Sequence, residues 1–257
     1  MTLPHFHIPE SLGTFLKDEE LRLVLSTDII AHMITLRLRP NERFTLVDPT
    51  GQTHTFELLE KPARKITSLP VRFCHSHHFK RPAFVRLVQG ISKGERMDQT
   101  IRQVTELGIA AIIPLESARS TVRLKEADRL KKQERWQRIA CAAADQSACT
   151  FVPEVYKPCN LAEALSLVSG DLLLVAWEEF SGQGIREAIA DTDSSSGVSL
   201  FIGPEGGFEK AEVDEMIAAG AIPLTLGHTV LRTETAAVIA SALVLHELGE
   251  LGNRPAP

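Results

Sequence analysis

The stretch Val198-Ser-Leu-Phe-Ile-Gly-Pro-Glu-Gly-Gly-Phe208 decides the fold of the second half of this chain. Its first five residues are the apolar run of a buried strand, and an amphipathic helical segment, Glu209–Ala219, follows. A glycine turn between a strand and a helix can bring backbone N–H groups close to a ligand, although such a turn can also be purely structural. The turn is neither G-x-G-x-x-G nor G-x-x-x-x-G-K-[ST]. Because Glu205 would repel a phosphate, the turn favours a neutral or cationic nucleoside.

A second segment, Leu226-Gly-His-Thr-Val-Leu-Arg-Thr-Glu-Thr-Ala236, repeats this arrangement. It follows a short strand, Ile222–Leu226, contains a glycine turn, and leads into a helix that we expect to begin at Thr233 or Glu234. Two turns of this kind in one chain suggest one pocket with two walls.

These segments, with others upstream, carry a family resemblance. Each is weak alone, but their order along the chain from about residue 32 is quite specific. The chain resembles the bacterial 16S ribosomal RNA (uracil-N3)-methyltransferases, the RsmE-type branch of the SPOUT superfamily. The matching pieces are Lys93–Asp98, Thr105–Gly108, Arg119–Ser120, Ala144–Ser147, Ile202–Phe208, Leu226–Gly227 and Leu231–Ala236.

The resemblance implies a fold and an activity that periodicity alone could not give. It implies a small PUA-like β-barrel RNA-binding domain at residues 1–78 and an α/β SPOUT methyltransferase domain at 79–257, with a C-terminal trefoil knot that forms the cofactor pocket. The implied activity is S-adenosylmethionine-dependent methylation of N3 of a specific uridine in 16S ribosomal RNA of the small subunit. The implied enzyme is a homodimer that needs no metal.

Composition is that of a soluble globular protein. The 257 residues are 44% hydrophobic and 24% charged, and no stretch approaches the length of a membrane-spanning helix. Met1–Glu20 has no signal-peptide core, and the four cysteines have neither C-x-x-C spacing nor disulfide density. We therefore expect a reduced, cytoplasmic protein without a membrane partner.

Charge is distributed unevenly along the chain. The net charge is −5, yet residues 61–96 hold nine Lys/Arg against one acid and residues 119–138 hold eight against three. Residues 139–257 hold five against seventeen. Such a chain can present a basic face to RNA phosphates while remaining acidic overall, although clustered, solvated surface charges would give the same count.

Apolar periodicity divides the chain into two parts. Alternation from His32 to Glu60, including Thr35–Arg39, predicts a small antiparallel β unit with a turn at Asp48–Gly51, and Lys61–Pro70 reads as a linker or an irregular strand. Beyond about residue 80, apolar runs alternate with helical segments, which predicts an α/β domain around a largely parallel sheet. The predicted strands are Phe84–Val88, Ala110–Leu115, Leu172–Ala176, Val198–Ile202 and Ile222–Leu226, and the predicted helices are 97–107, 127–147, 161–168, 184–190, 209–219 and 234–248.

The last predicted helix, Glu234–Leu248, is apolar on nearly every side. A helix of this kind is buried all round, either in the middle of its own domain or partly against a second subunit. The family resemblance favours the second arrangement, a homodimer interface.

Candidate site residues come mainly from the matched motifs. Arg232, one of five cations in the last 119 residues, is the candidate for stabilising a deprotonated uracil, although it could simply pair with Glu234 or Glu205. Glu205 and Glu234 are candidate proton acceptors by proximity alone. The expected cofactor contacts are Glu178, Ile202, Gly203, Pro204, Gly206, Leu226, Gly227, Leu231, Thr233, Thr235 and Ala236, of which the two threonines could instead cap the helix.

RNA contacts are expected from cations of the β unit, Arg37 and Arg39, and from cations of the basic segments, Arg64, Lys65, Lys93, Arg96 and Arg119. The run Cys74–His78 lacks the spacing of a closed zinc site and is interpreted as part of a basic loop. The chain departs from the family at His5 and Cys149, where an arginine is usual, and both departures put the placement of RNA in doubt.

Three other functions remain open on the sequence. They are a knotted methyltransferase for a different RNA, a ribosome-assembly factor that binds RNA without catalysis, and a nucleotide-cofactor oxidoreductase. The missing G-x-G-x-x-G pattern and the position of Glu205 disfavour the oxidoreductase.

Overall fold

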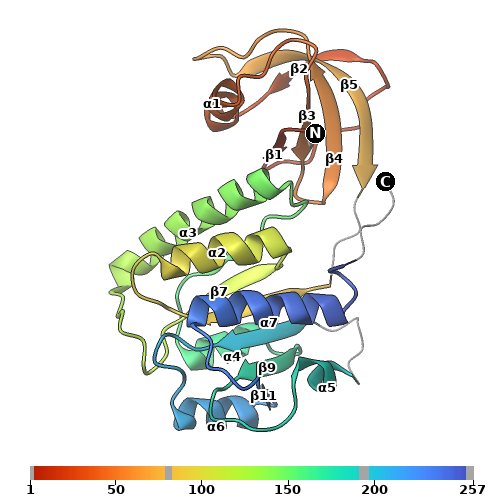
Figure 1. Ribbon diagram of the computed structural model, residues 1–257. Coiled ribbons are helices and arrows are strands. Elements are labelled where there is room, and N and C mark those ends of the chain that lie inside the picture. Colours follow the sequence, from red (N-terminus) through yellow and green to blue (C-terminus); the bar gives the residue numbers. More distant parts are fainter. Residues whose placement is uncertain (1–2, 79–82, 191–196, 253–257) are drawn as a thin grey trace. The chain divides into compact units, whose positions relative to one another are not determined.

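The computed structural model describes residues 3–78, 83–190 and 197–252 (Figure 1). Contacts divide the chain into two compact units: Met1–Arg81 with Ala144–Phe151, and Pro82–Ala143 with Val152–Pro257. The boundary expected from the sequence, after residue 78, leaves the short segment 144–151 out of the first unit. Each unit contains a hydrophobic core of its own.

The first unit is a five-stranded sheet with one helix. The strand order is β1-β3-β4-β5-β2, in which β1 runs parallel to β3 and the other neighbours are antiparallel. Its core is rich in phenylalanine, with Phe6, Phe44 and Phe56 buried. The elements are β1 His5–His7, β2 Glu20–Val24, α1 Thr27–Thr35, β3 Arg43–Val47, β4 Gln52–Leu58 and β5 Ser68–His78.

Part of the predicted β unit is confirmed and part is wrong. β3, β4 and the turn at Asp48–Gly51 occur as predicted, with the Gly51 N–H donating to the Asp48 carbonyl at 3.0 Å. Thr35–Arg39 is not a strand, because Thr35 ends helix α1 and Arg37 has a left-handed φ of 57°. The helix starts at its N-cap Ser26, and the helical spacing of Ile30 and Met33 buries one of its faces.

The second unit is a three-layer α/β structure around a six-stranded sheet, as the sequence predicts. The sheet order is β11-β9-β10-β6-β7-β8 and every pairing in it is parallel. The sequence missed only the two-residue strand β8. The strands are β6 Val85–Gly90, β7 Ala111–Leu115, β8 Glu154–Val155, β9 Leu172–Ala176, β10 Val198–Ile202 and β11 Ile222–Leu224, and the helices are α2 Arg96–Leu107, α3 Glu126–Ser147, α4 Leu161–Leu167, α5 Ile185–Ile189, α6 Lys210–Ala218 and α7 Thr233–Glu247.

Alternate residues of the central strands face two separate cores. In β10, Leu200 and Ile202 pack with helices α2, α3, α5 and α7, whereas Phe201 packs on the other face with α4 and α6 (Figure 1). Burial on both faces is why these strands read as continuous apolar runs. The α/β class therefore follows from the same pattern that predicts the strands.

Helix α7 is buried on one side only. Ala237, Ala240 and Val244 are fully buried, but Ile239 and Leu243 keep 43% and 42% of their surface exposed. Of the two arrangements expected from the sequence, burial in the middle of its own domain is therefore wrong, and α7 has an exposed apolar stripe.

No helix within the described ranges is long and apolar enough to cross a membrane. Cys74, Cys141, Cys149 and Cys159 form no disulfide bond in the described structure.

Candidate functional site

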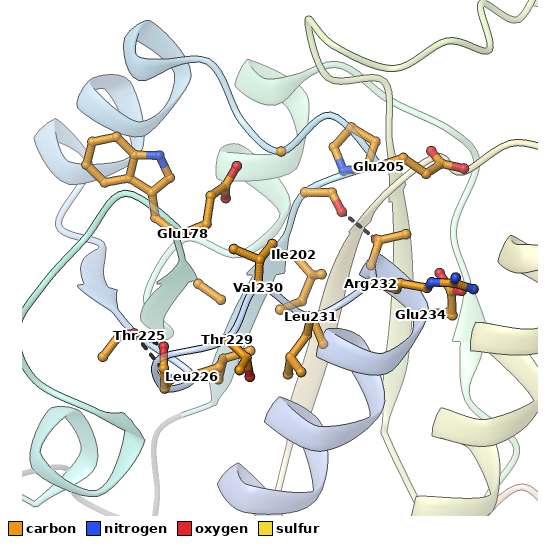
Figure 2. Close-up of a pocket in the computed structure, with 18 of the residues that line it drawn as sticks. Glu178, Ile202, Glu205, Thr225, Leu226, Thr229, Val230, Leu231, Arg232 and Glu234 are labelled. Atoms are coloured by element: carbon orange, nitrogen blue, oxygen red, sulfur yellow. Dashed lines mark hydrogen bonds between the residues drawn. The ribbon is translucent and has the colours of Figure 1, made fainter.

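A cavity of about 360 Å³ opens at the carboxyl ends of β9, β10 and β11 (Figure 2). Parallel strands place the loops that follow them at the same edge of a sheet, where α/β proteins usually bind ligands. Here those loops are the glycine turn after β10, the segment 225–232 after β11, and Trp177 and Glu178 after β9. The two segments singled out in the sequence thus form two walls of one cavity, as predicted.

The glycine turn after β10 is packed too closely to carry side chains. The Gly207 N–H donates to the Pro204 carbonyl at 2.9 Å, and Gly207 has a left-handed φ of 69°. A Cβ on Gly207 would lie 2.0 Å from Oε1 of Glu178, and a Cβ on Gly90 would lie 2.4 Å from the Pro204 nitrogen. Glycine is therefore required at these positions. Because Gly207 has no Cβ, the Glu178 carboxylate can lie directly against the backbone of the turn.

A hydrogen-bond network ties the start of α7 to this turn. The buried Thr233 hydroxyl donates to the Gly203 carbonyl at 2.5 Å and accepts from the Gln89 amide at 2.9 Å. Thr233 does not cap α7 with its side chain, because the N-cap residue is Arg232. The capping interpretation of Thr233 is therefore wrong, and its side chain instead joins the two walls of the cavity.

Glu205 is held at the rim of the cavity by the N-terminal end of α2. Its Oε1 accepts from the Lys93 backbone N–H at 2.9 Å and from the Arg96 guanidinium at 2.8 Å. Partial burial alone would raise the pKa of Glu205, but hydrogen bonds from its own backbone and from Lys93 and Arg96 outweigh burial and lower it. Glu205 is thus an ionised anchor, and a lowered pKa makes it a poorer proton acceptor.

Arg232 and Glu234 lie at the first turn of α7 (Figure 2). Arg232 is exposed and forms no ion pair with any described residue, so the predicted alternative of a pair with Glu205 or Glu234 is not formed. Glu234 is half-buried, and its Oε2 atom is buried without a hydrogen-bond partner. The cavity lining therefore includes a guanidinium that pairs with no described carboxylate, together with Glu234, whose buried Oε2 has no hydrogen-bond partner among the described residues.

Most of the expected cofactor contacts and all three catalytic candidates line the cavity. Gly206 and Thr235 are outside its described lining: the Gly206 carbonyl accepts from Arg119 at 3.1 Å, and Thr235 is exposed on α7. The residues that do line it are Glu178, Ile202, Gly203, Pro204, Leu226, Gly227, Leu231, Thr233 and Ala236, with Arg232, Glu205 and Glu234.

The sequence reasoning missed several lining residues, chiefly Trp177, Thr225, His228, Thr229 and Val230. All of them follow β9 or β11 directly. These residues could have been predicted from their position after the carboxyl ends of the predicted parallel strands, where ligands usually bind.

The candidate RNA contacts separate into free and engaged cations. In the first unit Arg37, Arg39, Arg64 and Lys65 are exposed, and their side chains form no ion pair with described residues. In the second unit the side chains of Arg96 and Arg119 hold the glycine turn through Glu205 and Gly206, whereas the Lys93 side chain is exposed.

Ion pairs also reduce the free charge of the basic segment 61–96. Arg72 pairs with Glu20 and Glu57, and Arg86 pairs with Asp171 at 2.9 Å. With Arg96 also engaged, the unpaired cations of the segment that the structure describes are Lys61, Arg64, Lys65 and Lys93. Lys80 and Arg81 lie outside the described residues.

The run Cys74–His78 belongs to strand β5 and not to a basic loop. The pairing of β5 with β4 shifts register here, because Thr55 pairs with His75 and Phe56 with Phe73, which leaves Cys74 as a bulge. No group of metal-ligating side chains occurs among the described residues.

The two departures from the family pattern lie together in the first unit. The ring of His5 hydrogen-bonds to the backbone at Cys149, and the neighbouring His7 Nδ1 lies 2.8 Å from Asp145 Oδ1. Burial, reinforced by the charge of His7, lowers the pKa of His5 to about 4. His5 is therefore a neutral, partly buried ring at neutral pH and supplies no charge for RNA.

The chain is similar to known proteins in sequence and in overall structure. Residues 80–245 match the family model described as RNA methyltransferase domain. Ribosomal RNA small subunit methyltransferase E of Bacillus subtilis is 32% identical over 224 residues, covering 85% of this chain and 87% of the relative. The protein of the same name from Aquifex aeolicus is 28% identical and covers 87% and 94%.

Two similar solved structures carry S-adenosylmethionine. A methyltransferase from Legionella pneumophila in complex with SAM has a TM-score of 0.80 and 30% identity, covering 96% of this chain and 98% of its own. Ribosomal RNA small subunit methyltransferase E from Neisseria gonorrhoeae, bound to S-adenosylmethionine, has a TM-score of 0.79 and 31% identity, covering 95% and 98%. With the cavity at the predicted sheet edge, the matched model and these relatives, the chain belongs to the RNA methyltransferase family that includes ribosomal RNA small subunit methyltransferase E.

Proposed function

We propose that this protein is an S-adenosylmethionine-dependent methyltransferase that methylates N3 of a specific uridine in 16S ribosomal RNA of the small subunit. The observation that carries the proposal is the cavity in which the glycine turn, the loop after β11 and the first turn of α7 converge. The relatives named for small-subunit ribosomal RNA methylation, and the SAM-bound structures similar to this chain, support it.

The chemistry of the cavity lining fits the cofactor. Ile202, Leu226 and Leu231 give apolar walls for an adenine ring, and backbone groups of the surrounding turns can read the edge of the base. Three carboxylates and two guanidiniums also line the cavity. S-adenosylmethionine carries a sulfonium, an ammonium and a carboxylate, so both signs of charge have counterparts. The three carboxylates outnumber the two guanidiniums, so the lining disfavours a bound pyrophosphate, which argues against the oxidoreductase alternative.

When bound, the cofactor supplies an electrophilic methyl group. The protein must then position the base and compensate the charge that appears when uracil loses its N3 proton. Arg232 is free to do so, because no described carboxylate holds its guanidinium. A planar guanidinium beside a uracil oxygen would stabilise the anion.

Between the two candidate proton acceptors, the structure favours Glu234 over Glu205. Glu205 already accepts two hydrogen bonds from Lys93 and Arg96, and its pKa is lowered. The Glu234 side chain also lines the cavity, and its buried Oε2 accepts no hydrogen bond from any described residue, so this carboxylate is less engaged than that of Glu205. We propose that Glu234 accepts the N3 proton and that Glu205 positions the glycine turn.

The finer architecture is part of the same proposal. We propose that the first unit is a PUA-like barrel that contacts RNA through Arg37, Arg39, Arg64 and Lys65, and that the end of the second unit forms a trefoil knot. We also propose a homodimer in which the stripe containing Ile239 and Leu243 packs against a second copy.

Two measurements test the proposed activity. Mass spectrometry of 16S ribosomal RNA from a strain that lacks the protein should show loss of one N3-methyluridine, restored by the wild-type gene. In single-turnover assays, Arg232→Ala should slow methylation roughly 100- to 1000-fold, the usual effect of removing a well-placed charge donor. Arg232→Lys should recover only part of this loss, and higher pH should narrow the Arg232→Ala deficit by deprotonating uracil directly.

Two controls separate catalysis from structure. The melting temperature of Arg232→Ala should stay near wild type, because the side chain is exposed and unpaired in the described structure, and cofactor affinity should fall far less than the methylation rate. Normal turnover by this variant would remove Arg232 from the mechanism. An unchanged methylation pattern in the deletion strain, with RNA binding retained, would favour an assembly factor without catalysis.

A further inference from the structure

A second cavity, of about 290 Å³, lies wholly within the first unit. It is bounded by one side of helix α1 and by the segment 64–66 that precedes β5. Its volume is near the lower end of the usual range for small-molecule sites, about 300 to 1000 Å³. The cavity is therefore large enough for one planar ring system and too small for a dinucleotide.

The floor of this cavity is aliphatic and its rim is cationic. Ile30, Ala31, Ile34 and Ile66 supply the apolar surface. Arg64 and Lys65, which we call the rim, also line the cavity, and both are exposed and without an ion-pair partner in the described structure. No acidic residue is among the described lining residues.

Backbone conformation fixes the position of the rim. Lys65 has a left-handed φ of 70°, which non-glycine residues seldom adopt. Ile66, the next residue, is half-buried and packs against the core of the unit. The two cations are thus held next to the apolar floor by their own segment.

The side of α1 that faces the cavity also offers polar groups. Thr27 and Thr35 line it near the two ends of the helix. The Thr35 hydroxyl donates its proton to the Ala31 carbonyl at 2.9 Å, so its oxygen remains free to accept a hydrogen bond from a ligand. An apolar slot with hydroxyls at its ends and cations at its mouth has the chemistry that recognises a nucleobase with its flanking phosphates.

We infer that this cavity binds one unpaired nucleotide of the RNA substrate, with the base against Ile30, Ile34 and Ile66 and the flanking phosphates on Arg64 and Lys65. The inference rests on the proposed action on ribosomal RNA, and it adds a base-binding site away from the methyl-transfer cavity. The charge of the rim favours RNA over a cationic or neutral partner.

Filling the cavity tests the base contact directly. Ala31 is an exposed helix residue that lines it, so Ala31→Phe should occupy the slot without disturbing the core. Affinity for protein-free 16S ribosomal RNA should fall, because the phenyl ring takes the place of the base. Ala63→Phe is the matched control, because Ala63 is exposed in the same segment but does not line the cavity.

Removing the rim charges tests the phosphate contacts. Arg64→Ala with Lys65→Ala should lower the slope of log affinity against log salt by about 1.4, or 0.7 for each single-strand phosphate. Ala31→Phe should weaken binding without changing this slope. Crosslinking with RNA that contains 4-thiouridine should place nucleotide adducts on peptides covering residues 27–35 or 64–66.

Three results would overturn the inference. The first is unchanged RNA affinity in a folded Ala31→Phe protein, and the second is a set of adducts that avoids both peptides. The third is weaker binding of Ala31→Phe to intact small subunits but not to protein-free RNA, which would indicate a protein side chain in the cavity. Methyl transfer and cofactor binding measured on the same samples distinguish these failures from failure of the proposed activity.

Discussion

Replacing Gly207 by alanine should weaken the cofactor site through Glu178. The new Cβ would lie 2.0 Å from Glu178 Oε1, well inside any possible contact, so the carboxylate must move. Glu178 is exposed and flexible, and the fold can tolerate that movement. If the carboxylate contacts the cofactor, its loss should weaken affinity roughly 10- to 150-fold, equivalent to the 1.5–3 kcal/mol of a hydrogen bond to a charged group.

Alanine at Gly207 also strains the backbone, and this second effect needs a matched control. Gly207 and Gly220 both have left-handed φ values, 69° and 96°, but a Cβ on Gly220 would meet nothing within 4 Å. Each alanine should cost about 1–2 kcal/mol of stability from the backbone alone. A chain of this size should then melt roughly 2–8 °C lower in both variants. Only Gly207→Ala should also lose cofactor affinity.

Calorimetric titration of S-adenosylmethionine into four proteins measures the effect. They are Gly207→Ala, Gly220→Ala, Glu178→Ala and the double variant of Gly207 and Glu178. If Gly207→Ala acts only by displacing the Glu178 carboxylate, it has no further effect once that carboxylate is removed. The double variant should then bind the cofactor no more weakly than Glu178→Ala does, because the effects of two coupled residues do not add. Equal affinities for Gly207→Ala and Gly220→Ala would refute the argument, as would fully additive losses in the double variant.

Three other perturbations test separate parts of the molecule. Glu205→Gln should weaken cofactor binding several-fold while leaving the shape of the pH–rate profile unchanged, because Glu205 anchors the turn and does not take the proton; a lost acidic limb in single-turnover rates would make Glu205 the base. Ile239→Glu with Leu243→Glu should shift light scattering from dimer to monomer without lowering helical circular dichroism, because both side chains are exposed on α7, and an unchanged mass would place the interface elsewhere. Burial lowers the pKa of His5 from about 6.5 in the unfolded chain to about 4 in the folded protein, so the unfolded state binds more protons between these two pH values. The free energy of unfolding measured in urea should therefore fall as the pH drops from 6.5 to 4. His5→Gln should flatten this pH dependence.

The sequence by itself determined the architecture of the second unit. Strands that are buried on both faces must be apolar throughout, and the helices that cover them must be amphipathic. The alternation of such segments after residue 80 therefore indicates an α/β domain around a largely parallel sheet. The same logic located the cavity, because turns that follow parallel strands gather at one edge of the sheet. The glycines at positions 203, 206 and 207 predicted a tight turn in the sequence, because few other residues allow such close backbone packing.

Local pattern misled where it was short. Thr35–Arg39 alternates like a strand, but it is the end and exit of a helix that starts at Ser26. Five residues cannot separate a period of 2 from one of 3.6 when the helix extends upstream. Cys74–His78 was mistaken for a loop because its polar residues hide the strand period.

Only the tertiary structure decided which charges are free. Arg86, Arg96 and Arg119 look alike in the sequence as basic residues, yet each is held by a residue at least 80 positions away. Arg232 and Glu234, by contrast, are close in the sequence and of opposite charge, yet they form no ion pair with each other in the described structure. Ion pairs of this kind depend on distance in space, and one sequence records only distance along the chain. The roles of an anchor at Glu205 and a free guanidinium at Arg232 could therefore be separated only once the chain was folded.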